Sequence, residues 1–101
     1  MLKHKYHAKK TIRDGLNFPS RLEAKHYDQL KTMQAAGEIL FFLRQIPFDL
    51  PGNTKYRADF MLFFTDGHVE IWDSKGVLTT DFIMKKKVVE ALYPVEIKIV
   101  K

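Results

Sequence analysis

Two apolar, strand-like segments flank the dipeptide Asp66-Gly67, and each contains a carboxylate where a buried strand would normally have an apolar residue. Residues 56–64 and 69–74 are rich in aromatic and β-branched side chains, and an Asp-Gly dipeptide favours a tight hairpin turn between two strands. Asp59 lies in the first segment, Asp73 in the second, and Lys75 follows two residues later. An ionised carboxylate among apolar groups is costly unless it is paired, hydrogen-bonded or bound to a metal. The fold must therefore provide such partners, and a metal site would do so.

The composition limits the class of protein. The 101 residues are enough for one domain with a single core, and 46% of them are hydrophobic, including eight Phe. The sequence has no Cys, so any metal must be bound through oxygen or imidazole ligands. We find no signal-peptide pattern and no apolar run approaching the roughly 20 residues of a membrane span. We therefore expect a non-membrane, cytoplasmic protein.

The charge favours a polyanionic partner. Seventeen Lys and Arg against twelve Asp and Glu give a net charge of +5, which suits phosphate contacts on nucleic acid. A generic basic surface that keeps the protein in solution is the alternative. Residues 1–10 are predicted to form a flexible basic arm, for which the alternative is simply a disordered terminus. The basic residues that we expect to contact DNA in this arm and just after it are Lys3, Lys5, Lys9, Lys10 and Arg13.

The local patterns predict a mixed α/β domain. A short hairpin forms within residues 8–18, and a helix runs from the cap at Ser20 to Ala36, before Gly37. Residues 38–50 are too apolar for a half-exposed strand, so we expect a central or interface strand. The hairpin of residues 56–74 follows, then a helix capped by Thr79 or Thr80, then a strand over 95–100. The pattern predicts that the whole chain, residues 1–101, is one domain in which helices pack on a mixed sheet.

The spacing of the charged residues predicts a site at the second hairpin. Side chains two apart on a strand share a face, so Asp73 and Lys75 project together. If the strand of Asp59 is the hairpin partner, the two carboxylates lie close and would repel unless a divalent cation such as Mg²⁺ sits between them. The alternative is a surface salt bridge between Asp73 and Lys75, with Asp59 capping a turn.

Two further charged residues have both a structural and a functional interpretation. Glu23 follows the capping Ser20 at capping-box spacing, yet it also falls within the helix face that should meet the sheet. Lys85 belongs to a lysine run whose ordinary role is a solvated helix face. However, it lies on the arc shared with Val88, so its ammonium could reach a DNA phosphate or the site at the sheet edge.

Taken together, these residues resemble the PD-(D/E)xK nuclease superfamily, with its restriction-endonuclease-like αβββαβ core. Glu23 resembles the helical carboxylate of that family, Ala58-Asp59 its Pro-Asp element, and Asp73-Ser74-Lys75 its (D/E)xK element. The chain departs from the pattern in having Ala58 in place of Pro and Asp73 as the less common carboxylate. Within the superfamily, the arrangement is similar to small phage and prophage proteins and to phage-type Holliday-junction endonucleases.

The resemblance implies Mg²⁺-dependent hydrolysis of DNA, with Mn²⁺ able to substitute. Asp59, Asp73 and the Ser74 carbonyl would be metal ligands, with Glu23 as an outer or second-metal ligand. Lys75 would act as a cation that orients the attacking water. The catalytic set implied is therefore Glu23, Asp59, Asp73 and Lys75.

The resemblance leaves the substrate open. The preferred interpretation is a structure-selective endonuclease for Holliday-junction or branched DNA, in the host-cell cytoplasm if the protein is phage-encoded. Two symmetric cuts at a junction require a homodimer, for which the apolar run over residues 39–43 offers an interface. The alternatives are a nicking, flap or end-processing DNase with the same site, and a non-catalytic DNA-binding phage accessory protein.

Overall fold

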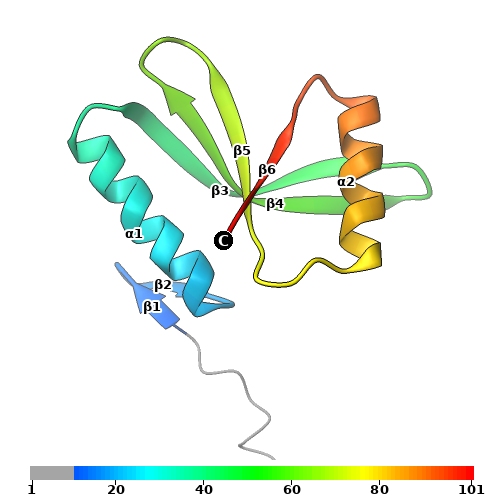
Figure 1. Cartoon of the computed structure of the whole chain (residues 1–101), viewed down its shortest axis with the longest axis horizontal. Helices are drawn as coiled ribbons and strands as arrows, with labels where there is room; N and C mark the ends of the chain where they lie inside the picture. The colour runs from blue at the N-terminus through cyan, green and yellow to red at the C-terminus, as the bar shows by residue number, and fades with distance from the viewer. Residues whose placement is uncertain (1–10) are drawn as a thin grey trace, which may run out of the picture.

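The computed structural model describes residues 11–101, and its elements follow the predicted order (Figure 1). Strands β1 (Thr11–Arg13) and β2 (Leu16–Phe18) form a short antiparallel hairpin. The elements after it are α1 (Arg21–Ala35), β3 (Ile39–Leu50), β4 (Thr54–Phe64), β5 (Val69–Ser74), α2 (Thr80–Leu92) and β6 (Ile97–Val100). From α1 onward the order is αβββαβ, which confirms the predicted fold class. The predicted basic arm over residues 1–10, with Lys3, Lys5, Lys9 and Lys10, lies outside the described residues.

The helices begin and end where the sequence signals predict. Ser20 caps α1 by accepting a hydrogen bond from the backbone N–H of Glu23 at 3.0 Å. At the other end, Gly37 adopts a φ of +80°, and the Glu38 N–H donates to the Met33 carbonyl, so a left-handed glycine closes the helix. Thr79 caps α2 through the N–H of Phe82, which resolves the choice between Thr79 and Thr80.

The main sheet is mixed, with the strand order β3-β4-β5-β6. The first three strands are antiparallel neighbours, and β6 pairs in parallel with β5. Strand β3 is therefore an edge strand, and the prediction of a central position for residues 38–50 was wrong. The interpretation of this segment as an interface strand stays a prediction.

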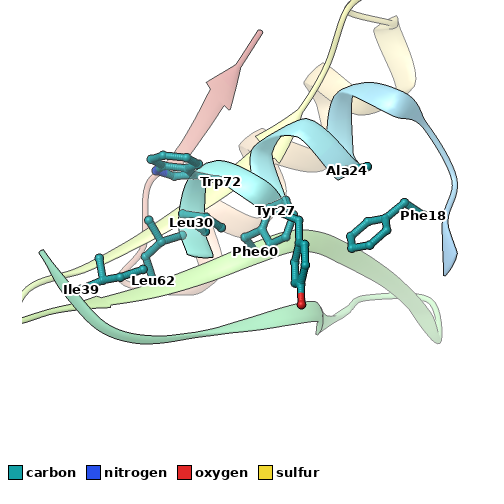
Figure 2. Packing of buried hydrophobic residues seen from close by; sticks show 8 residues of the cluster. All are labelled: Phe18, Ala24, Tyr27, Leu30, Ile39, Phe60, Leu62 and Trp72. Carbon is teal, nitrogen blue, oxygen red and sulfur yellow. The ribbon is translucent and has the colours of Figure 1, made fainter. Parts of the chain in front are cut away.

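Two apolar cores lie on the sheet, one under each helix. Figure 2 shows the core beneath α1, where Leu30 packs with Phe60, Leu62 and Trp72. The core beneath α2 contains Phe82 and Val89 with residues of all four strands of the sheet, namely Phe48, Tyr56, Ala58, Ile71 and Ile97. Neighbouring residues Ile71 and Trp72 on β5 belong to different cores, so the helices cover opposite faces of this strand.

The β3–β4 hairpin serves both cores in turn, which explains why its edge strand is so apolar. On β4, Phe60 and Leu62 pack in the α1 core, whereas Tyr56 and Ala58, on the same alternation, pack in the α2 core. The change occurs at Asp59, between the register pairs Arg44–Phe60 and Ile46–Ala58 of the hairpin. Figure 1 shows the hairpin running from beside α1 to beside α2.

Within residues 11–101, neither helix has the length and apolar character needed to cross a bilayer.

Candidate functional site

The candidate site forms where β4 and β5 separate. The regular ladder between the two strands ends at the pair Phe60–Trp72, and the next residues along are Asp59 and Asp73. The backbone N–H of Asp59 donates to Asp73 Oδ1 at 3.1 Å, and the N–H of Ser74 donates to Asp59 Oδ2 at 2.8 Å. Each carboxylate thus accepts a hydrogen bond from a backbone N–H, as a carbonyl of the neighbouring strand would do in a regular ladder. Asp59 is therefore not a turn cap, as one alternative had it.

Asp73 is the most buried carboxylate of the site. Its residue is only 1% exposed, and Oδ2 is buried without a hydrogen-bond partner among residues 11–101. Burial raises the pKa of Asp73 to about 6, against the lowering effects of the Asp59 N–H and the Lys75 charge. Buried polar atoms normally have a partner, so Oδ2 is available to a group from outside residues 11–101.

Glu23 reaches the same site from α1. Its carboxylate is directed inward and accepts a hydrogen bond from the Gln45 side chain at 2.9 Å, and the residue is 3% exposed. Burial, followed by the charge of Asp59, raises the pKa of Glu23 to about 7. The pKa of Asp59 is also raised, mainly by its own burial. Ser20 caps the helix by accepting the Glu23 N–H, but the Glu23 carboxylate binds Gln45 and makes no hydrogen bond back to the Ser20 N–H among the described residues. The capping-box role predicted for this carboxylate was therefore wrong, and the carboxylate contributes to the acidic site.

Gln45 is a site residue that the sequence did not reveal. It lies in the middle of β3 with a φ of +55°, a left-handed conformation that side chains other than Gly rarely adopt. Its place between the pairs Arg44–Phe60 and Ile46–Ala58 puts it level with Asp59, and its amide binds Glu23. No local pattern marks a left-handed residue inside a strand, so only the tertiary structure could identify it.

Lys75 lies on the α2 side of the two carboxylates. Its backbone N–H donates to the Val100 carbonyl at 3.1 Å, which continues the β5–β6 pairing by one residue. The ammonium lies over the ring of Phe82, 4.9 Å from its centroid, and its charge lowers the pKa values of Asp59 and Asp73. Within residues 11–101 it makes no ion pair with Asp73, so the alternative of a simple surface salt bridge was wrong.

Ser74 connects the site to α1. Besides donating its N–H to Asp59, it places its hydroxyl 2.6 Å from His26 Nδ1. His26 Nε2 lies 3.4 Å from the Lys101 carbonyl, and burial lowers the pKa of this imidazole. His26 therefore fixes the end of β5 against the helix that also carries Glu23.

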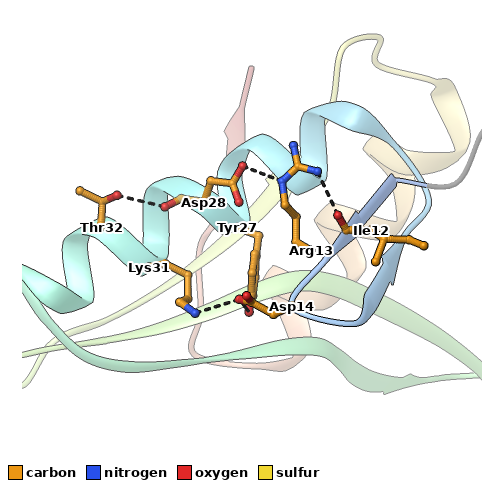
Figure 3. Close-up of polar contacts among 7 residues, drawn as sticks. All are labelled: Ile12, Arg13, Asp14, Tyr27, Asp28, Lys31 and Thr32. Carbon is orange, nitrogen blue, oxygen red and sulfur yellow. Dashed lines mark hydrogen bonds and ion pairs between the residues drawn. The ribbon is translucent and has the colours of Figure 1, made fainter.

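The two described residues that we expected to contact DNA differ in their surroundings. Figure 3 shows Arg13 bound to Asp28 on α1, with an Nε–Oδ2 distance of 2.9 Å, while Tyr27 and Lys31 both bind Asp14. These contacts dock the β1–β2 hairpin on α1, and Arg13 is already engaged there. Lys85 instead lines a cavity beside Lys75, although it also pairs with Asp81 at 3.3 Å.

The donor set can be compared with what a divalent cation needs. Among residues 11–101, no three His, Asp or Glu side chains are grouped closely enough to form a metal cage on their own. The site instead offers two neighbouring carboxylates, with Asp73 Oδ2 unpartnered, and Mg²⁺ commonly uses only one or two protein carboxylates and keeps several waters. The residues therefore fit a hydrated cation held by Asp59 and Asp73.

Comparison with known proteins gives one family. A family model described as "Protein of unknown function (DUF1064)" matches residues 3–101, which is nearly the whole chain. No curated protein matches the sequence. The chain belongs to the DUF1064 family.

Proposed function

We propose that this protein is a metal-dependent DNA endonuclease of the PD-(D/E)xK type. The observation that carries the proposal is the buried pair Asp59 and Asp73, each held by a backbone N–H of the other strand, with Asp73 Oδ2 left without a partner among the described residues. A buried carboxylate oxygen that the fold leaves unpartnered is costly, and such sites are characteristic of function rather than of stability.

The residues have separate roles in the proposed reaction. Asp59, Asp73 and the Ser74 carbonyl would hold Mg²⁺ or Mn²⁺, and Glu23 would act as an outer ligand through water or at a second metal. When bound, the ion lowers the pKa of its water and offsets charge on the phosphoryl oxygens. Gln45 holds the Glu23 carboxylate toward Asp59, so its role is positioning.

Lys75 supplies positive charge on the α2 side of the carboxylates. Its contact with the Phe82 ring holds the ammonium without neutralising it. A fixed cation there can orient the attacking water and stabilise the phosphorane-like charge as the P–O bond to the leaving strand breaks. Hydrolysis adds one water, so one DNA end keeps the phosphate and the other gains the proton as a hydroxyl.

Substitutions at the site provide the direct test. Asp59→Asn, Asp73→Asn and Lys75→Met should each reduce cleavage by about a hundredfold or more while still retarding DNA in a gel. Asp28→Asn on α1 and Lys87→Met on α2 are matched controls, because both are exposed and lie outside the site. Full activity in any of the three site variants would refute the assignment.

Comparing cleavage of several DNA substrates shows which DNA structure the protein prefers. Four-way, flapped, nicked and linear duplexes are incubated with the protein in Mg²⁺, in Mn²⁺ and in chelator. We expect preference for the four-way junction. Preference for flapped or linear DNA would identify a flap or end-processing DNase, and intact DNA in every lane would favour a non-catalytic DNA-binding protein.

Junction cleavage also requires two copies of the chain. The edge strand β3 leaves apolar side chains in solvent, with Leu40 59%, Phe41 43% and Leu43 44% exposed, and this surface supports a homodimer through β3. Sedimentation at micromolar concentration should give a dimer, and Leu40→Lys with Leu43→Lys should dissociate it. A monomeric wild-type protein would count against junction cleavage and leave the single-cut alternatives.

A further inference from the structure

A polar cavity of about 260 Å³ lies next to the candidate site, on the side of α2. Arg57 precedes Asp59 by two residues on β4, and Lys75 follows Asp73 by two residues just after β5. Each cation thus lies two residues beyond a carboxylate of the site, away from the pair Phe60–Trp72 at which the β4–β5 ladder ends. Both side chains line the cavity, so it begins where the pair Asp59 and Asp73 ends.

The lining of the cavity is strongly positive. Among the described residues that line it, four are cations, Lys55, Arg57, Lys75 and Lys85, and one, Asp81, is a carboxylate. Lys55 pairs with Asp49, and Lys85 pairs with Asp81. Arg57 and Lys75 have no ion-pair partner within residues 11–101, although both line the cavity.

A second observation is independent of the charges. Tyr56 also lines the cavity and is 5% exposed, and its hydroxyl is buried with no hydrogen-bond partner among residues 11–101. A buried tyrosine hydroxyl usually finds an acceptor. Cations together with an unused neutral donor form the set of groups that binds a phosphate oxygen.

We propose that this cavity is a phosphate subsite, which binds a phosphate of the nucleic acid strand adjacent to the phosphate at the acidic site. The identity of that strand rests on the proposed endonuclease function, whereas anion binding by the cavity does not. Arg57 is the principal phosphate ligand, Tyr56 donates its hydroxyl, and Lys85 adds charge from α2. The fold brings these residues together, so neither Arg57 nor Tyr56 stands out in the sequence.

The test measures anion binding in chelator, where no cleavage can occur. Backbone amide NMR shifts are followed while the full chain is titrated with inorganic phosphate and, separately, with a single-stranded tetranucleotide. We expect saturable shifts near residues 55–57 and 75–82 with both probes, and at least about tenfold tighter binding of the tetranucleotide because it offers several phosphates. Shifts elsewhere, or none, would overturn the subsite, and equal affinity for both probes would refute its use for a nucleic acid strand.

Variants identify the ligands. Arg57→Ala and Tyr56→Phe should each weaken phosphate binding by about tenfold, as expected for lost hydrogen bonds to a charged group. Lys85→Ala should weaken it by a few-fold, and the matched control Lys87→Ala, on the same helix but outside the cavity, by less than about twofold. Thermal unfolding of each variant separates loss of binding from loss of fold. If Lys87→Ala weakens binding as much as Arg57→Ala, the affinity is general surface charge and the proposal fails.

The two proposals can fail separately. Phosphate binding without cleavage of any DNA in Mn²⁺ would retain the subsite and reject the endonuclease. Cleavage that depends on Asp73, without phosphate binding in the cavity, would retain the endonuclease and reject the subsite.

Discussion

Replacing Asp73 with Asn should make the metal-free protein less sensitive to alkaline pH. Asp73 is 1% exposed, and its Oδ1 accepts the Asp59 N–H while Oδ2 has no partner within the described residues. The Asp73→Asn variant would keep an acceptor for that N–H and lose the charge. The substitution therefore isolates the free energy of ionising a carboxylate in this position.

The size and sign of the effect come from the pKa of Asp73. Burial raises this pKa from 3.8 to about 6, so the folded protein binds more protons than the unfolded chain between these values. The contribution of Asp73 to stability is therefore fully present below pH 3.8 and is lost as the pH rises through 6. The loss corresponds to about 3 kcal/mol, because one pKa unit is worth about 1.4 kcal/mol.

Urea unfolding in chelator at a series of pH values measures this effect. The difference in unfolding free energy between Asp73→Asn and the wild type should shift by up to about 3 kcal/mol in favour of the variant from about pH 4 to about pH 8. All other titrating groups are common to both proteins, and any constant packing cost of the amide cancels. A difference for Asp73→Asn that does not depend on pH would refute burial as the cause.

Three further predictions concern the metal, the positioning residue and the core. Mn²⁺ at about a hundredfold excess over its dissociation constant should stabilise the wild type by about 2.7 kcal/mol in thermal unfolding. The same Mn²⁺ concentration should not stabilise Asp73→Asn, and equal stabilisation of both proteins would exclude Asp73 as a ligand. Gln45→Ala removes the hydrogen bond that lowers the pKa of Glu23, so NMR titration should place this pKa further above its value of about 7; an unchanged pKa would contradict the contact. Leu30→Ala, at a fully buried position beneath α1, should cost about 2–5 kcal/mol in urea unfolding, whereas Leu92→Ala, at an exposed position on α2, should cost less than about 1 kcal/mol.

The features that the sequence predicted correctly depend on contacts between near neighbours. Ser20 caps the helix that begins beside it, Gly37 ends that helix in a left-handed conformation, and Asp14-Gly15 forms the first hairpin turn with positive φ at both residues. Each of these needs only a few residues of chain to form. The element order followed from them, because the caps and turns divide the sequence at the correct places.

The features that the sequence missed depend on how distant segments meet. The apolar composition of residues 38–50 predicts a central strand, whereas β3 is an edge strand. The composition indicates that side chains are buried, but it does not show against which of the two cores they pack. Gln45 has an ordinary side chain for an exposed strand, and only the turn of the hairpin between two cores accounts for its φ of +55°. Likewise, Arg57 and Tyr56 can be recognised as cavity residues only once the fold brings β4 beside Lys75 and α2.

The two aspartates of the site also serve the fold, and this double role gives a way to separate structure from chemistry. Where the β4–β5 ladder ends, the N–H groups of Asp59 and Ser74 have no strand carbonyl, and the carboxylates of Asp73 and Asp59 accept them instead. A purely structural role needs only an acceptor, so Asn would satisfy it, whereas Leu would leave a buried N–H unpaired at a cost of about 1–3 kcal/mol. A metal ligand needs the charge as well. A purely structural pair would thus tolerate Asn and not Leu in every assay, while the proposed endonuclease should fold with Asn at either position and fail to cut DNA.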